Sequence, residues 1–247
     1  DISSEIQLNP FDIRFQTLTH SIPEPNSLFI KTKLGTIYHT GDWKIDDNPI
    51  VGESIDFNKL KENSEEVLAM VCDSTNVLTS GRSGSESTVR GNLAGVIKKL
   101  KNRVFVTSFA SNVARLETIA AAAKESGRSL VVLGRSMHRM ISVARQNGIL
   151  KDIDVILSEK DAAKKKKHEV LYLCTGSQGE PRGAMMRISN QDFPHIDIDQ
   201  DDCVIFSSKI IPGNEKKIFK LFNRLSELGA EVITEYDEDI HVSGHPC

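Results

Sequence analysis

The stretch RVFVTSFASNVARLETIAAAAKESGRSLVVLGRSMHRMISVARQN, residues 103–147, decides the fold class. It begins with an apolar run over 103–108 and continues with a segment of helical periodicity over 112–126. Both patterns then repeat, over 129–133 and 136–147. Short apolar runs that alternate with helices are typical of a parallel sheet with helices on both faces. The stretch therefore predicts an α/β unit.

The same alternation extends to both sides of this stretch. We expect helices over 87–100 and 214–228 and further strands over 170–174, 203–207 and 231–235. The chain before residue 73 has a different pattern. Its alternating segments predict strands over 11–19, 27–32 and 36–40, joined by short turns as in an antiparallel meander. A short apolar run, VLAMVC at 67–72, is typical of a strand buried on both faces. Two kinds of domain are therefore expected.

The composition excludes several classes of protein. The 247 residues are 39% hydrophobic and 26% charged, as in ordinary globular proteins. The net charge of −3 lacks the basic excess of a protein that coats nucleic acid non-specifically, although it leaves room for a local basic groove. No apolar run approaches the roughly 20 residues that cross a bilayer, so no membrane contact is expected. The four cysteines show no close spacing, which favours reduced thiols, with Cys72 and Cys174 in the core.

Polar residues gather where the predicted strands end, which is where open α/β sheets place their ligand-binding groups. Each group alone has an ordinary structural explanation. Asp42 suits a turn, Asn112 suits a helix N-cap, and the glycine-rich segment 175–179 suits either a tight turn or an anion-binding nest. Together, however, His20, Asp42 and a late pair of histidines suit a metal site, because imidazole and carboxylate are ligands of metals such as zinc.

Several motifs occur in an order that identifies a family. THSIP at 19–23 is followed by HTGDWKID at 39–46, and then come DSTN at 73–76, SFASN at 108–112, GRSM at 134–137, TGSQGEP at 175–181, IPGNE at 211–215 and HVSGH at 241–245. The first two resemble the metallo-β-lactamase core of the ribonuclease J family, and the others resemble its β-CASP domain. Each motif alone is weak, but the ordered set is specific and covers nearly the whole chain.

The resemblance implies an α/β protein that contains part of a metallo-β-lactamase αββα fold, with the parallel-sheet β-CASP domain inserted into it. The domains implied are a partial metallo-β-lactamase domain over 1–74, the β-CASP domain over 75–240, and the start of the return to the first domain over 241–247.

The resemblance also implies a metal-dependent ribonuclease that hydrolyses RNA phosphodiesters, as an exonuclease from the 5′ end and as an endonuclease. His20 and Asp42 match metal ligands, and Asp73 and His245 match catalytic residues. The residues that match the pocket for a nucleotide phosphate are Ser111, Asn112, Val113, His241, Val242, Ser243, Gly244 and His245. The implied cofactor is Zn²⁺, two ions in a complete site, with Mn²⁺ as the alternative. The implied partner is single-stranded RNA, preferably with a 5′-monophosphate. The implied location is the cytoplasm, and the full-length protein is expected to form a homodimer or homotetramer.

The chain departs from the family pattern in its metal ligands. The family's His-x-His-x-Asp-His motif does not occur in the sequence. We therefore expect a central fragment that lacks part of the metal site and does not cleave RNA by itself. Two alternatives stay open: a non-catalytic module that binds RNA or a nucleotide 5′-phosphate, and another metallo-β-lactamase-fold hydrolase that acts on a small ester.

Overall fold

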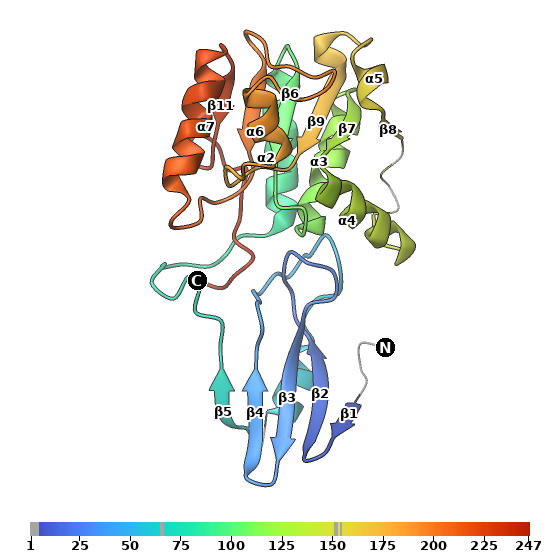
Figure 1. Ribbon diagram of the computed structural model, residues 1–247. Coiled ribbons are helices and arrows are strands. Elements are labelled where there is room, and N and C mark those ends of the chain that lie inside the picture. Colours follow the sequence, from blue (N-terminus) through green and yellow to red (C-terminus); the bar gives the residue numbers. More distant parts are fainter. Residues whose placement is uncertain (1–4, 65–66, 151–152, 154) are drawn as a thin grey trace. The chain divides into compact units, whose positions relative to one another are not determined.

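The computed structural model describes residues 5–64, 67–150, 153 and 155–247. The chain divides into two compact units, drawn in Figure 1. Unit 1 comprises residues 1–85 and 243–247, and unit 2 comprises residues 86–242. Among the described residues, no helix combines the length and the apolar character that crossing a membrane requires.

Unit 1 contains a five-stranded sheet in the order β1-β2-β3-β4-β5. Its strands are β1 (Glu5–Leu8), β2 (Phe11–Thr17), β3 (Asn26–Thr32), β4 (Gly35–His39) and β5 (Val67–Val71). The pairs from β1 to β4 are antiparallel, as the meander pattern predicted, and β5 pairs with β4 in parallel. A short helix, α1 (Phe57–Asn63), precedes β5, and the side chain of Asp56 caps it by accepting from two backbone N–H groups. Neither β1 nor α1 was predicted.

The prediction that the run 67–72 is buried on both faces is wrong. The run does form a strand, but Leu68 is 69% exposed and Met70 is 60% exposed. The reason is its position, because within the described part of the chain β5 is the last strand of the sheet and pairs only with β4. Cys72, expected in the core, is likewise exposed, whereas Cys174 is buried as expected. An apolar run predicts a strand, but its burial depends on what lies against it.

Unit 2 is built on a six-stranded sheet in the order β11-β10-β6-β9-β7-β8, in which every pair of neighbours is parallel. The strands are β6 (Val104–Thr107), β7 (Ser129–Leu133), β8 (Ile156–Leu157), β9 (Val170–Cys174), β10 (Cys203–Phe206) and β11 (Glu231–Ile233). The helices are α2 (Glu86–Lys99), α3 (Val113–Glu125), α4 (Arg135–Gln146), α5 (Glu159–Ala162), α6 (Ala184–Ser189) and α7 (Glu215–Glu227), with a 3-10 turn at Lys167–Glu169. The prediction of a mixed α/β unit on a parallel sheet is confirmed.

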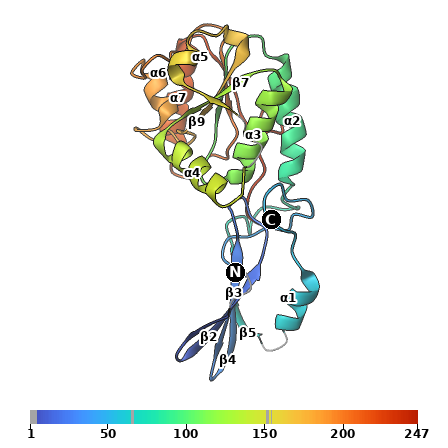
Figure 2. The same cartoon turned by 90° about the vertical axis from the view of Figure 1, so that its right-hand side faces the viewer.

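Both faces of this sheet are buried, which explains why its strands are continuous apolar runs. Figure 2 shows α2 and α3 on one side of the sheet and α6 and α7 on the other. Side chains alternate between the two sides along each strand. Phe105 and Tyr172 stack with ring centroids 4.6 Å apart and belong to the core cluster that includes α6 and α7. Their neighbours Val106 and Leu171 are also fully buried.

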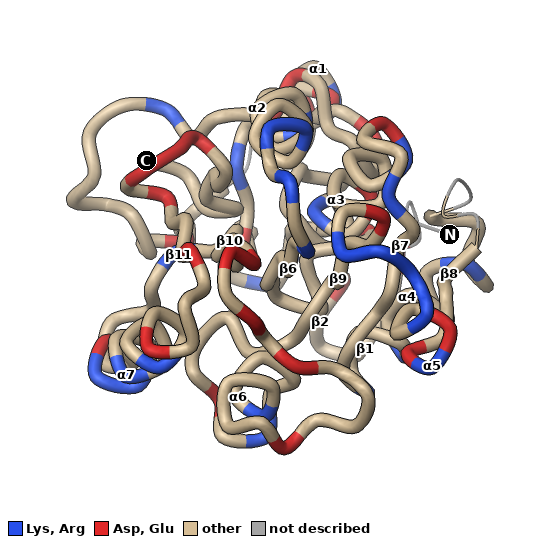
Figure 3. The backbone as a smooth tube through the Cα atoms, turned by 90° about the horizontal axis from the view of Figure 1, so that it is seen from above, with Lys and Arg blue, Asp and Glu red and all other residues tan. Residues whose placement is uncertain are grey.

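Charged residues of both signs are mixed over the chain, as Figure 3 shows. The longest basic run, Lys164–Lys167, follows α5 and leads to β9. Lys164 pairs with Asp161, and Lys167 pairs with Asp199. Acidic neighbours therefore offset part of the charge of this run.

Candidate active site

Four of the predicted site residues converge in unit 1. His20, Asp42 and His245 each offer a metal-ligand atom, and these atoms lie within 4.8 Å of one another. The rings of His20 and His245 are 5.2 Å apart between centroids. Asp73 contacts His245 directly, with 2.7 Å between Oδ2 and Nδ1. Residues that are up to 225 positions apart in the sequence therefore share one site.

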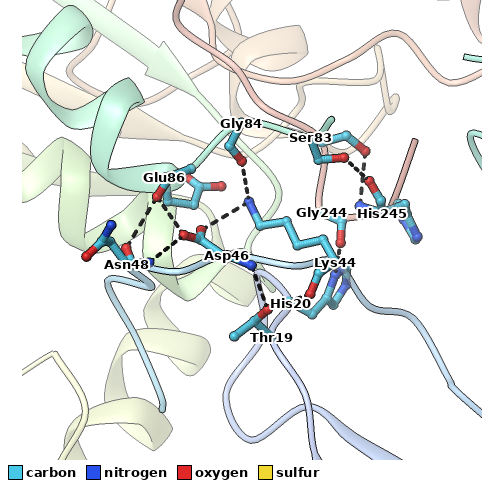
Figure 4. A network of polar contacts seen from close by, with 12 residues as sticks. Thr19, His20, Lys44, Asp46, Asn48, Ser83, Gly84, Glu86, Gly244 and His245 are labelled. Carbon is cyan, nitrogen blue, oxygen red and sulfur yellow. Dashed lines mark hydrogen bonds and ion pairs between the residues drawn. The ribbon is translucent and has the colours of Figure 1, made fainter. Parts of the chain in front are cut away.

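A short pairing places His20 beside the loop that carries Asp42. Thr19 and Lys44 form an isolated antiparallel bridge, in which the Lys44 N–H donates to the Thr19 carbonyl over 2.8 Å. The Thr19 hydroxyl donates to the Lys44 carbonyl and accepts from the N–H of Asp46. Figure 4 shows the contact between Thr19 and Asp46. Because Lys44 and Asp46, which closely follow Asp42, are both bonded to Thr19, the loop that carries Asp42 is held beside His20.

Thr40 fixes Asp73 in a similar way. The Thr40 N–H donates to the carbonyl of Val71 at the end of β5, and the Thr40 hydroxyl accepts from the N–H of Asp73 over 3.0 Å. The Asp73 carboxylate also accepts from the N–H of Thr75 over 2.9 Å. The parallel pairing of β4 with β5 therefore brings the ends of both strands, and the acidic residues that follow them, to one edge of the sheet.

The segment 243–247 is held in unit 1 by side chains of the loop that follows Asp73. Asn76 donates to the Ser243 hydroxyl over 2.8 Å and to the His245 carbonyl over 3.3 Å. Ser83 also donates to the His245 carbonyl (Figure 4). Ser243 and Gly244 were predicted to bind phosphate. In the structure they belong to this anchored segment, and the Ser243 hydroxyl accepts a hydrogen bond from Asn76.

His20 is oriented by the backbone of this same segment. Its Nδ1 lies 2.6 Å from the carbonyl oxygen of Gly244 (Figure 4). A carbonyl can only accept, so Nδ1 carries the proton and Nε2 is left for a metal ion. Only glycine fits at position 244, because a Cβ atom there would lie 2.6 Å from the ring of His20. Burial lowers the pKa of His20 below its usual value, although the hydrogen bond to Gly244 opposes this effect. A neutral imidazole is the form that binds metals.

His245 is oriented by Asp73. The side chain of Asp73 is only 3% exposed, and burial alone would raise its pKa. Hydrogen bonds from Thr75 and from His245 outweigh this effect and lower the pKa of Asp73 to about 2. The carboxylate is therefore ionised at neutral pH and holds Nδ1–H of His245, which again leaves Nε2 for chemistry.

Sequence reasoning missed a buried lysine next to the site. Lys44 is 1% exposed, and its ammonium donates to the Gly84 carbonyl over 2.9 Å and pairs with Asp46 at 3.4 Å (Figure 4). Its charge also lowers the pKa of His20. The sequence around Lys44 gives no periodic signal of burial, which is revealed by long-range contacts such as that with Gly84.

A cleft of about 890 Å³ opens in unit 1 beside Asp73. Its wall is partly apolar, with Trp43, Ile45 and Phe57, and partly polar, with Arg82 and Ser83 among others. The cleft therefore reaches Asp73, the partner of His245, from solvent.

The other predicted phosphate-binding residues belong to unit 2. Ser111 is exposed, whereas Val113 is fully buried, so Val113 can offer only backbone groups. Asn112 caps α3, since its side chain accepts from the N–H of Arg115 over 2.9 Å. His241 and Val242 are half-buried. Of this set, the side chains best able to contact an anion are those of Ser111 and His241.

The glycine-rich segment 175–179 forms a tight turn whose N–H groups are used within the protein. The N–H of Gln178 donates to the Glu180 carboxylate over 2.9 Å, and the N–H of Gly179 donates to the Gly176 carbonyl. Gly183 approaches Gly176 so closely that a Cβ atom would lie 2.6 Å from its Cα, which seats the start of α6. The anion at this turn is therefore the carboxylate of Glu180 and not a ligand from solvent.

Comparison with known proteins identifies the family. A family model described as the ribonuclease J beta-CASP domain matches residues 101–225, half of the chain. The chain belongs to the ribonuclease J family. Ribonuclease J from Sinorhizobium meliloti is 43% identical over 242 residues, which are 98% of this chain and 43% of that protein. The proteins of the same name from Corynebacterium glutamicum and Thermus thermophilus are 41% and 37% identical, and the chain spans 33% and 41% of their lengths.

The ribonuclease J relatives are thus more than twice as long as this chain. A solved structure of a protein of unknown function from Enterococcus faecalis V583 superposes with a TM-score of 0.65 at 15% identity, over 99% of this chain and 55% of that one. At this identity the likeness concerns the fold alone.

Proposed function

We propose that this chain carries part of the active site of a metal-dependent ribonuclease, in which His20 and Asp42 bind a divalent metal ion and Asp73 and His245 act on the RNA. The observation that carries the proposal is the convergence of His20, Asp42 and His245, with ligand atoms within 4.8 Å of one another. We further propose that unit 1 is part of a metallo-β-lactamase fold.

The donors fit a divalent cation such as Zn²⁺, with Mn²⁺ as the alternative. Both histidines have Nδ1 engaged, by Gly244 and by Asp73, so each ring offers only Nε2. Histidine ligands that are fixed in this way by a carbonyl or a carboxylate are the common arrangement at metal sites. A bound divalent cation would supply positive charge to stabilise the charge that develops on a phosphodiester. A site with two metal ions needs more ligands than His20 and Asp42 provide.

The Asp73–His245 pair can move a proton. An ionised carboxylate on Nδ1–H stabilises the imidazolium and holds the ring in one orientation. Nε2 of His245 is therefore suited to protonate the leaving oxygen of RNA or to contact the scissile phosphate. We therefore assign His245 this catalytic role and keep His20 and Asp42 as the metal ligands.

A phosphate pocket for the 5′ end of single-stranded RNA completes the proposal. In unit 2, the exposed Ser111 precedes the N-terminus of α3, where backbone N–H groups favour anions. His241 offers an imidazole, and Asn112, Val113 and Val242 hold the local backbone.

The pocket can be tested by binding alone. Fluorescence anisotropy would compare 5′-monophosphorylated with 5′-hydroxyl single-stranded RNA of one sequence. We expect tighter binding of the monophosphate, and His241→Gln combined with Ser111→Ala should remove the difference. Equal affinity of the unmodified chain for the two RNAs would contradict the pocket and, with it, the binding-module alternative.

The metal site needs a separate test. Trp43, the single tryptophan of the chain, follows Asp42 directly, so its fluorescence should respond to added Zn²⁺ or Mn²⁺. We expect weak binding that Asp42→Ala abolishes, without RNA turnover by this chain. Clear turnover that Asp42→Ala abolishes would show that the ligands present suffice for catalysis, and a metal response that survives Asp42→Ala would refute the assignment of this site.

A further inference from the structure

A charged side chain lies at the centre of unit 2. Arg115, in the first turn of α3, is fully buried. Its guanidinium makes a forked contact with Glu86 at the start of α2, from Nε to Oε2 over 3.0 Å and from Nη2 to Oε1 over 3.0 Å. Glu86 is itself only 2% exposed. A forked pair of this kind has both charge and geometry matched, which a buried charge requires.

The remaining guanidinium nitrogen connects α3 to the segment that leads into the HVSGH motif. Nη1 shares its two hydrogens among nearby acceptors, which include the carbonyl of Ser207 at 2.9 Å, its hydroxyl at 2.6 Å and the Ile240 carbonyl at 3.2 Å. The Ser207 hydroxyl in turn donates to the same Ile240 carbonyl over 2.6 Å. Ile240 is fully buried. Arg115 therefore anchors the residue before His241 to the end of β10.

The same nitrogen lies 3.3 Å from Nδ1 of His241. A guanidinium has five N–H donors and no acceptor, and it stays charged in proteins. Nδ1 of His241 must therefore be the acceptor in this contact. A neutral imidazole that accepts at Nδ1 carries its proton on Nε2, and a second proton on Nδ1 would face a fixed positive charge.

We propose that Arg115 is a positioning residue that holds His241 in the neutral tautomer with the proton on Nε2, so that the ring presents an N–H donor to an anionic oxygen of RNA. The proposal rests on the proposed function for the identity of the anion, but not for the state of the ring. Glu86 takes part by fixing the guanidinium, and Ser207 by fixing the backbone that carries the ring.

The state of the ring can be measured without RNA. Long-range ¹H–¹⁵N correlation spectra of the histidine-labelled chain at neutral pH, assigned with His241→Gln, distinguish the two neutral tautomers and the imidazolium. We expect an unprotonated Nδ1 and a protonated Nε2 for His241. A protonated Nδ1 in the unmodified chain would overturn the proposal.

A double variant tests the cause. Arg115→Met with Glu86→Leu removes the donor without leaving a lone buried charge, since well-packed apolar residues can replace buried ion pairs. We expect His241 to become a mixture of tautomers. The matched control is Arg103→Met with Asp202→Leu, which removes another ion pair of unit 2, between the partly buried Arg103 and the buried Asp202 at 2.7 Å, and should leave the His241 signals unchanged. A folded Arg115 variant with the original tautomer would refute the proposal, as would an equal change in the control.

Binding then separates this proposal from the proposed function. If half of the His241 rings leave the competent tautomer, the affinity for 5′-monophosphorylated RNA should fall about twofold, and the affinity for 5′-hydroxyl RNA should not. If the unmodified chain does not discriminate between these RNAs, the proposed function fails, while the spectra still decide the role of Arg115.

Discussion

At the scale of single residues, the site depends on a few fixed hydrogen bonds. Asp73 is the clearest case, because its pKa of about 2 in the folded chain lies below the ordinary value of 3.8. A lowered pKa means that folding favours the ionised form. This contribution to stability is therefore fully present above about pH 4 and is lost as the pH falls toward about 2. Its size is on the order of 2 kcal/mol.

Asp73→Asn should accordingly destabilise unit 1 at neutral pH, and its difference from the unmodified chain should shrink as the pH falls from about 4 to about 2. Urea unfolding followed by Trp43 fluorescence reports on unit 1, since Trp43 is the only tryptophan. Asp47→Asn, which alters an exposed carboxylate of the same cleft, is the control. A difference that stays constant across this range would contradict the assignment.

Gly244→Ala should displace the ring of His20. The added Cβ atom would overlap the ring and the Ser21 hydroxyl, and one of these groups has to move. We expect a loss of about 1–3 kcal/mol in the free energy of unfolding of unit 1, as for other overpacked sites. The same urea titration measures it, and an unchanged midpoint would show that the segment 243–247 shifts without cost.

At the scale of elements, substitutions in α2 are expected to increase stability instead of lowering it. Gly91 and Gly95 lie within this helix, and a Cβ atom at either position would meet nothing within 4 Å. Alanine should therefore stabilise the helix, by about 0.5–1 kcal/mol at each position. Thermal unfolding followed by circular dichroism would show a higher midpoint for Gly95→Ala, and a lower midpoint would mean that α2 has a partner at this position.

The edge strand β5 gives a second prediction at this scale. Its exposed apolar side chains and unpaired edge favour association between copies of the chain. Met70→Lys should reduce concentration-dependent light scattering with little change in stability, because Met70 is 60% exposed. Scattering equal to that of the unmodified chain would exclude β5 as the contact.

The strands and helices that the sequence predicted are those with enough residues to show a pattern. The strands of the 103–147 stretch and its two helices form where periodicity placed them. The helix α6 was missed, because its six residues show less than two turns and it is seated by the contact between Gly176 and Gly183. The burial of β5 could not be predicted, since it depends on neighbours and not on the strand itself.

The residues of the site likewise divide into those that the sequence could predict and those that depend on distant neighbours. Position at strand ends, together with the resemblance of the ordered motifs to the ribonuclease J family, selected His20, Asp42, Asp73 and His245, which the structure brings together. Lys44 and Arg115 were missed, because a buried charge is recognised by its distant partners. Arg115 did carry a signal, since it lies four residues before Ile119 on the buried side of α3.

At the scale of the whole molecule, the two units differ in how much apolar surface they bury. Among the described residues, the buried apolar side chains of unit 1 are Leu18, Phe29 and Ile55, whereas the strands and helices of unit 2 contribute most of the core. Unit 1 should therefore unfold at a lower urea concentration. Trp43 fluorescence follows unit 1, and far-UV circular dichroism is dominated by the helices of unit 2. Coincident transitions would show instead that the two units unfold together.

The hydrogen bond between His20 and Gly244 spans 224 positions of the chain, and that between His245 and Asp73 spans 172. During translation, a ribosome must release the entire inserted unit before either bond can form. A nascent polypeptide that stops anywhere within that unit would leave His20 without the carbonyl that orients its ring and Asp73 without its imidazole partner.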